Sequence, residues 1–287
     1  MKVVNLSGGL GNQMFQCAFA YTLKEKFPFD EVLLDIQHFK GYNWHNGFEV
    51  ASVFEGIPFR VASKSEIRKV TYYIPNYRLS RLARKVLPKR RSEYVEISNY
   101  VYDPHVYELS GSTYYEGFWQ ACQYYLPFRQ HLLSLFSFSS PGGRNLEMAT
   151  KIESTDSVGI HVRRGNYLQF EEYKGICDVD YYKKGLDAID CHGKTFFIFS
   201  NDMEWCRENI SPLVNGKDII YVDINDSANG QWDMYLMSHC RNLIIANSSF
   251  SWWAAFLNEN ALSVVAPSRW INADKRFDIQ CPGWIKI

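Results

Sequence analysis

The sequence predicts an α/β fold that is built from parallel sheets and divided into two domains. After residue 157, apolar strand-like segments alternate with helical segments, which is the pattern of a doubly wound parallel sheet. A separate βαβ pattern opens the chain. Between these regions, residues 139–145 are rich in Ser, Pro and Gly, so we place the domains at residues 1–140 and 146–287. A chain of 287 residues is long enough for two ordinary domains.

The opening segment predicts a strand, a glycine-rich turn, a helix and a second strand at residues 2–6, 7–12, 13–27 and 31–36. Gly9 and Gly11 let a ligand or a neighbouring chain approach the backbone of the turn, and the helix start offers N–H groups to an anion. Met14 stands where a dinucleotide-binding fingerprint has its third glycine. An ordinary strand-to-helix turn is therefore the alternative.

A basic amphipathic helix is expected between residues 78 and 91. This stretch has seven basic residues and no acid, with Leu79, Leu82, Ala83 and Val86 at helical spacing. Such a helix could rest on an anionic membrane surface, which would suit an enzyme that acts on lipid-linked substrates. A solvated helix face is the alternative.

The stretch from residue 157 to residue 167 carries the strongest functional signal. A β-branched run at residues 158–162 fits a buried strand, and polar residues follow at its carboxyl end, where open α/β sheets bind ligands. Arg163 and Arg164 carry planar guanidinium groups that match phosphate oxygens, and His161 can donate to or accept from the same ligand. The pattern predicts an anion clamp; two solvated arginines after a strand are the alternative.

Further strands are expected at residues 195–200, 219–224, 243–246 and 262–266, with helices near residues 180–189, 202–209, 231–239 and 251–257. After two of these strands, short polar side chains stand where a helix begins. Ser248 and Ser249 could bring hydroxyl and N–H groups to a diphosphate, and simple N-capping is the alternative. Asn201 and Asp202 stand at the other such position.

Asp178 and Asp180 form an Asp-x-Asp pair that could hold a divalent metal through carboxylate oxygens. Asp180 is also suited to cap the following helix, and we favour the cap, because a Mg²⁺ site needs further ligands that the sequence does not indicate. The cysteines show neither a Cys-x-x-Cys motif nor the Cys/His spacing of a zinc site.

Composition excludes several classes of function. Lys plus Arg and Asp plus Glu both number 31, so we expect no nucleic-acid partner. The chain does not open on a signal-peptide pattern, and no apolar run approaches the ~20 residues that span a bilayer. We therefore expect a cytoplasmic protein, which the basic helix could hold at the inner face of the membrane.

Four stretches together resemble the bacterial branch of the α-1,2-fucosyltransferase family of inverting glycosyltransferases. They are residues 8–16 (Gly-Gly-Leu-Gly-Asn-Gln-Met-Phe-Gln), 161–167 (His-Val-Arg-Arg-Gly-Asn-Tyr), 199–206 (Phe-Ser-Asn-Asp-Met-Glu-Trp-Cys) and 247–255 (Asn-Ser-Ser-Phe-Ser-Trp-Trp-Ala-Ala). The resemblance implies a GT-B fold, in which two Rossmann-like domains face each other across a cleft. It also implies transfer of L-fucose from GDP-β-L-fucose to the 2-hydroxyl of a galactose-terminated glycan, with inversion and without a metal or other cofactor.

The same resemblance implies roles for single residues. Arg163 would neutralise the diphosphate, His161 and Asn12 would orient the phosphate or the fucose, and two serines would bind phosphate at a helix start. The donor-binding candidates in the chain are Gly9, Asn12, Arg163, Arg164, Asn201, Asp202, Ser248 and Ser249, of which Asn201 and Asp202 would line the nucleoside pocket. The C-terminal domain would bind the donor. The N-terminal domain would bind the acceptor through aromatic residues, with Trp44 and Trp119 as candidates.

One position departs from the family pattern. Asn166 stands where the family's Arg-Arg-Gly-Asp-Tyr has an acid, and an amide cannot accept the acceptor's hydroxyl proton as a carboxylate would. We still expect activity, because a dissociative reaction depends strongly on stabilisation of the leaving diphosphate. Replacement acids could be Glu171, Glu172, Asp178 or Asp180, which makes Arg163, His161, Glu171 and Asp180 the catalytic candidates. The alternatives are a metal-dependent nucleotide-sugar transferase that uses Asp178 and Asp180, and a non-catalytic carbohydrate-binding relative.

Overall fold

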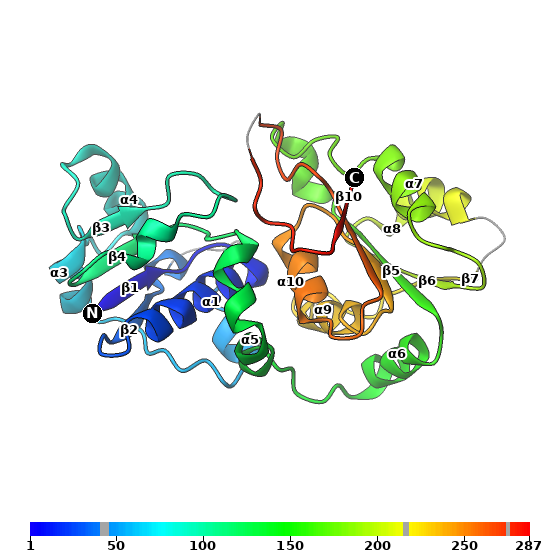
Figure 1. Cartoon of the computed structure of the whole chain (residues 1–287), viewed down its shortest axis with the longest axis horizontal. Helices are drawn as coiled ribbons and strands as arrows, with labels where there is room; N and C mark the ends of the chain where they lie inside the picture. Colours follow the sequence, from blue (N-terminus) through cyan, green and yellow to red (C-terminus); the bar gives the residue numbers. More distant parts are fainter. Residues whose placement is uncertain (41–45, 215–217, 274–275) are drawn as a thin grey trace. The chain divides into compact units, whose positions relative to one another are not determined.

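The computed structural model of the chain describes residues 1–40, 46–214, 218–273 and 276–287 (Figure 1). Two compact units make up the chain, Met1–Ser137 and Phe138–Ile287. Each unit has a parallel sheet of its own, with helices packed on it.

The sheet of the first unit has four parallel strands in the order β2-β1-β4-β3. The strands are β1 (Lys2–Asn5), β2 (Val32–Asp35), β3 (Glu93–Val95) and β4 (Thr113–Glu116). The helices are α1 (Leu10–Lys26), α2 (Val50–Val53), α3 (Lys64–Val70), α4 (Tyr77–Val86) and α5 (Arg129–Leu135), with short 3₁₀ helices η1 (Gln37–Phe39), η2 (Pro104–Tyr107), η3 (Cys122–Tyr124) and η4 (Leu126–Phe128). The predicted βαβ unit is confirmed. Its helix begins at Leu10 rather than at residue 13, because Gly9 already has the extended backbone of an N-cap (φ −79°, ψ 179°).

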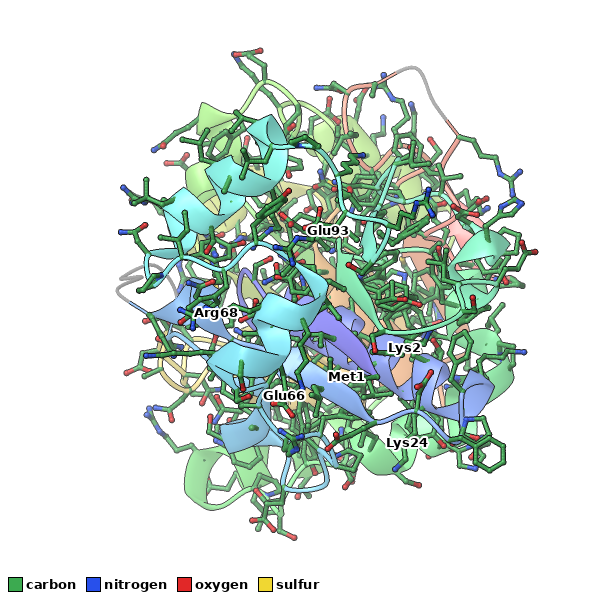
Figure 2. All side chains as sticks on the ribbon, turned by 90° about the vertical axis from the view of Figure 1, so that its left-hand side faces the viewer. Met1, Lys2, Lys24, Glu66, Arg68 and Glu93 are labelled. Carbon is green, nitrogen blue, oxygen red and sulfur yellow. The ribbon has the colours of Figure 1, made fainter. Side chains whose placement is uncertain are left out.

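Neighbouring residues of β4 point to opposite faces of this sheet. Tyr114 joins a core formed with the aliphatic side chains of β1, β2 and α3. Figure 2 shows this unit from the side, with Glu66 and Arg68 on α3 and with Met1 and Lys2 at the start of β1. Tyr115 faces α1 instead, and its ring meets that of Phe19 edge to face at 5.5 Å.

The second unit has six parallel strands in the order β10-β9-β8-β5-β6-β7. The strands are β5 (Ser157–Val162), β6 (Thr195–Ser200), β7 (Asp218–Tyr221), β8 (Asn242–Ile244), β9 (Ser263–Ala266) and β10 (Ile285–Lys286). The helices are α6 (Gly143–Glu153), α7 (Val179–Asp187), α8 (Met203–Asn209), α9 (Gln231–Met237) and α10 (Ser249–Leu257), with 3₁₀ helices η5 (Gly165–Gln169) and η6 (Ser211–Val214). Each strand and helix predicted for this region is confirmed in type, although β7 and β8 are shorter than predicted. Within the described ranges, no helix is long and apolar enough to cross a bilayer.

The strand order of the second unit is that of a Rossmann fold. The chain runs outward from β5 through β6 and β7, then restarts at β8 beside β5 and runs outward through β9 and β10. Ligands of such sheets bind at the carboxyl ends of the two central strands, where the direction of winding changes. In Figure 1, α7 and α8 lie on one side of this sheet and α9 and α10 on the other. The positions after β5 and β8 are therefore the first place to look for a site.

Candidate active site

Two segments meet at the carboxyl ends of β5 and β8, the two central strands of the second unit. The residues after β5 come from the Arg-Arg stretch, and the residues after β8 lead into α10. The imidazole of His161 lies 6.0 Å from the ring of Phe250 on α10, measured between ring centroids. The two motifs, more than 80 residues apart in the chain, thus form one cluster.

Contacts within the second unit hold both the side chain and the backbone of Arg164. Its Nε donates to Asp202 at 3.1 Å, its guanidinium carbon lies 4.2 Å from the ring centroid of Trp205, and its backbone N donates to Asn201 Oδ1 at 2.9 Å. Asp202 also caps α8, so both of its oxygens are engaged. Gly165 permits this approach, because it has φ +53° and an added Cβ would lie 2.5 Å from Asn201 Nδ2. Through these contacts the three residues fix the loop after β5 to the start of α8, and their contact with the donor stays a prediction.

Arg163 points elsewhere. Successive residues leave a strand on opposite faces, so Arg163 shares the α10 face with His161, while Arg164 is directed to the α8 face. The guanidinium carbon of Arg163 lies 5.7 Å from the ring centroid of Tyr167. Among the described residues, no carboxylate pairs with Arg163, whose side chain is half-buried. Its charge is therefore free to meet an anionic ligand at this edge.

His161 is buried and uncharged. Burial, reinforced by the charge of Arg163, lowers the pKa of its imidazole to about 3. Its exposed fraction is 6%, and its Nδ1 has no hydrogen-bond partner in the described part of the chain. The backbone carbonyl of His161 is fixed by the Tyr182 hydroxyl, which donates to it at 2.9 Å. The free nitrogen of a neutral imidazole can donate a hydrogen bond to a ligand oxygen or accept one from a hydroxyl, depending on the tautomer.

The three serines at the start of α10 have different roles. Ser248 is the N-cap, and its hydroxyl oxygen accepts from Phe250 N at 3.3 Å. Ser251 is wholly buried and donates to the carbonyl of Ala246 at 3.3 Å. Ser249, the first residue of α10, is half-buried, and its hydroxyl makes no hydrogen bond within the described ranges. The structure thus supports capping for Ser248 and leaves the Ser249 hydroxyl and the helix N–H groups for an anion.

In the first unit, the glycine-rich turn and the loop after β4 are tied together. Asn12 Oδ1 accepts from Gln120 Nε2 at 2.7 Å, and Gln16 Nε2 donates to the carbonyl of Gly117 at 3.0 Å. The positive φ of the turn, +80°, belongs to Gly8, where an added Cβ would lie 2.6 Å from Asn12 Nδ2. Sequence reasoning missed the roles of Gln16 and Gln120, because a glutamine that bonds to a residue far away in the chain carries no local pattern. Gly9 and Asn12 are partly exposed and lie at the carboxyl edge of the sheet.

The two acceptor candidates have different outcomes. Trp44 lies outside the described residues. Trp119 has an exposed fraction of 0%, and its ring stacks on that of Phe19 with 4.0 Å between centroids. Its backbone N donates to the carboxylate of Glu96. The prediction that Trp119 contacts the acceptor is therefore wrong: its faces are already covered by the aromatic core of the first unit, and no sugar can stack on them.

The acidic candidates lie around α7 and in the loop before it. Asp178, not Asp180, caps the helix, since its Oδ1 accepts from Tyr181 N at 2.9 Å. Asp180 is exposed in the first turn. Glu171 is exposed and pairs with Lys174 at 3.1 Å, also on the surface. Among the described residues, no group of three or more His, Cys, Asp or Glu side chains could hold a metal.

A pocket of about 270 Å³ lies between the start of α7 and the residues after β9. Asp178, Asp180, Lys184 and Arg269 are among its lining residues. The loop before α7 also reaches the carboxyl edge of the sheet, because Cys177 Sγ lies 3.5 Å from Asn247 Oδ1, next to Ser248. The loop that leads into the pocket residues of α7 therefore contacts the segment that begins α10.

Two Rossmann-like units in one chain, with a cationic edge on the second, define the GT-B class of glycosyltransferases. The fold is shared with the solved structure of the fucosyltransferase NodZ from Bradyrhizobium (13% identity, 92% of this chain and 93% of that chain, TM-score 0.51). The family model for glycosyl transferase family 11 matches residues 1–287, and the chain belongs to this family.

Among curated relatives, the chain is similar to an α-1,2-colitosyltransferase from Escherichia coli, with 32% identity over 99% of this chain and 98% of the relative. It is 28% identical to the O-antigen biosynthesis glycosyltransferase WbnK from Escherichia coli, over 98% of this chain and 99% of the relative. A galactoside α-(1,2)-fucosyltransferase 1 from Bos taurus is 33% identical over 45% of this chain and 34% of the relative.

Proposed function

We propose that this family 11 enzyme transfers L-fucose from GDP-β-L-fucose to the 2-hydroxyl of a terminal galactoside, with inversion to an α-1,2 linkage. The observation that carries the proposal is Arg163, which has no carboxylate partner among the described residues and lies at the winding change of a Rossmann sheet, near the start of α10. Family membership and the relatives' printed activities support the same reaction. The second unit would bind the donor and the first unit the acceptor.

The leaving GDP sets the main chemical demand on the site. The bond between the anomeric carbon and the β-phosphate oxygen breaks with its electron pair on oxygen, while the acceptor's 2-hydroxyl oxygen bonds to that carbon from the opposite face. The Arg163 guanidinium, the Ser249 hydroxyl and the N–H groups of α10 would stabilise the growing phosphate charge. Neutral His161 would orient a phosphate or sugar oxygen through its unsatisfied nitrogen.

The fate of the acceptor's proton is a separate question. Asn166, in η5, cannot accept it as a carboxylate would. Of the two predicted acids, Glu171 is paired on the surface with Lys174, and Asp180 lies in the lining of the pocket at the start of α7. We propose that turnover depends more on Arg163 than on any base, and that no metal takes part.

The nucleoside would occupy the pocket at the start of α7. Its volume, about 270 Å³, is close to the lower end of ligand pockets, about 300 Å³. The carboxylate of Asp180, which makes no hydrogen bond or ion pair within the described ranges, lines this pocket and could accept the two N–H donors on guanine's pairing edge. Arg269, on the opposite wall, could meet the ribose or a phosphate.

A second donor is favoured by one observation. A relative that matches nearly the whole chain is an α-1,2-colitosyltransferase, and colitose is fucose without its 3-hydroxyl. Initial rates with GDP-fucose, GDP-colitose and GDP-mannose against lactose, N-acetyllactosamine and Galβ1,3-linked acceptors would decide between the donors. We expect transfer from GDP-fucose with or without excess EDTA. Inhibition by EDTA that Mg²⁺ restores would support the metal-dependent alternative. GDP binding by folded protein without transfer to any acceptor would support the non-catalytic one.

A further inference from the structure

The apolar side of α4 faces outward. The exposed fractions are 50% for Leu79, 53% for Leu82 and 69% for Val86, and Leu87 at the C-cap is 43% exposed. A helix that packs on a sheet normally buries such residues. Here they form a stripe on the surface of the first unit, because positions three and four apart lie on one side of a helix.

The orientation of α4 is fixed by its other side. Ser80, Ala83 and Arg84 are buried instead of the leucines. Arg84 Nε donates to Glu116 at 2.7 Å, and its guanidinium carbon lies 5.2 Å from the ring centroid of Tyr114. A rotation of α4 that buried the leucines would move the Arg84 guanidinium away from Glu116 and Tyr114. The exposed stripe is therefore a property of the packed helix.

Basic side chains border the stripe. Arg78, Arg81 and Lys85 follow one another along the helix beside the leucines, and Lys89 and Arg91 come directly after it. Arg81 lies 3.9 Å from Glu116. Within the described ranges, no acid pairs with the other four residues. Because the formal net charge of the chain is zero, this is a local concentration of positive charge.

We propose that α4 and residues 87–91 form a docking surface for an anionic lipid bilayer. Leu79, Leu82, Val86 and Leu87 would enter the boundary between headgroups and acyl chains, and the basic residues would contact the phosphates. Apolar and cationic residues side by side on one exposed helix are the composition of interfacial helices. A protein partner is a poorer match, because lysine is depleted at protein interfaces.

The position of α4 in the first unit gives the proposed membrane contact a functional consequence. Arg84 anchors the helix to Glu116, the last residue of β4, and the loop that follows β4 is the one that bonds to Asn12 and Gln16. The lipid surface would thus lie beside the carboxyl edge of the first unit's sheet. A glycan carried on a lipid would be presented to that edge. The membrane contact itself does not depend on which sugar the enzyme transfers.

Flotation of the full-length protein with phosphatidylcholine vesicles, with and without phosphatidylglycerol, tests the proposal. We expect binding to the anionic vesicles only, and weaker binding at high salt. The double variants Leu79→Ser/Leu82→Ser and Arg78→Glu/Lys85→Glu should each bind at least ~10-fold more weakly, since burial of apolar area and attraction to anionic lipid both contribute. Transfer to a soluble galactoside should stay at the wild-type rate in both, which shows that the variants fold.

Matched controls come from the same unit. Phe29→Ser removes a fully exposed aromatic residue, and Lys24→Glu reverses an exposed charge in the last turn of α1; both should bind vesicles as the wild type does. Three results would overturn the proposal: no flotation with anionic vesicles, equal binding to neutral ones, or unchanged binding after Leu79→Ser/Leu82→Ser. The last would leave only adsorption by charge.

Discussion

Removing each arginine of the Arg-Arg pair separately should have opposite consequences for catalysis and stability. Arg163 has no carboxylate partner in the described part of the chain, and its nearest ring, that of Tyr167, is 5.7 Å away. Arg163→Ala should therefore cost less than about 1 kcal/mol of unfolding free energy. Loss of a charged donor to the leaving phosphate should lower kcat by about 10²–10³.

Arg164→Ala should show the reverse. The variant loses a half-exposed ion pair with Asp202 and a cation–π contact with Trp205, together about 1–2 kcal/mol after allowance for solvent screening. Its kcat should fall less than about 10-fold, because the guanidinium is used inside the unit and not on the donor. The Lys variants at both positions keep the charge and serve as controls.

The assay is the initial rate of GDP release with GDP-fucose and lactose, together with thermal unfolding of each variant. A further readout is the pKa of His161, which Arg163 helps to lower; it should rise in Arg163→Ala and not in Arg164→Ala. A near-normal rate for Arg163→Ala, or equal losses of rate in both variants, would refute the division of roles between the two side chains.

Three other predictions follow from the same contacts. Below about pH 6.5 the unfolded chain protonates His161, while the folded chain keeps it neutral down to about pH 3. As the pH falls through this window, the unfolding free energy of the wild type should decrease by up to ~1.4 kcal/mol per pH unit. His161→Asn should flatten this slope in pH-dependent thermal melts, and an identical slope would contradict it. Gly165→Ala should destabilise by more than Gly193→Ala, because both have positive φ but only the former meets Asn201; equal melting temperatures would show that no clash occurs. Asp180→Asn should raise the KM for GDP-fucose several-fold with little change in kcat, whereas a collapse of kcat would point to a metal or base role.

The sequence by itself predicted the opening βαβ unit and the strands and helices after residue 157, and it indicated where an anion could bind along the chain. β-branched runs alternating with amphipathic helices predicted a parallel sheet, and the polar residues after residues 162 and 246 predicted a ligand site at its carboxyl edge. The motifs were also sufficient for the family. These features depend on local chain geometry and on spacing, which a single sequence displays.

Only the tertiary structure decided what each polar or aromatic side chain does. It separated Arg163 from Arg164, because the partner that neutralises Arg164 lies on another strand's loop. It moved Trp119 from a binding surface into a core, since Phe19 covers its face. It also exposed the leucines of α4, because the buried Arg84 on the same helix pairs with the half-buried Glu116. Such outcomes depend on competition between residues far apart in the chain for the same partners, and local patterns do not record that competition.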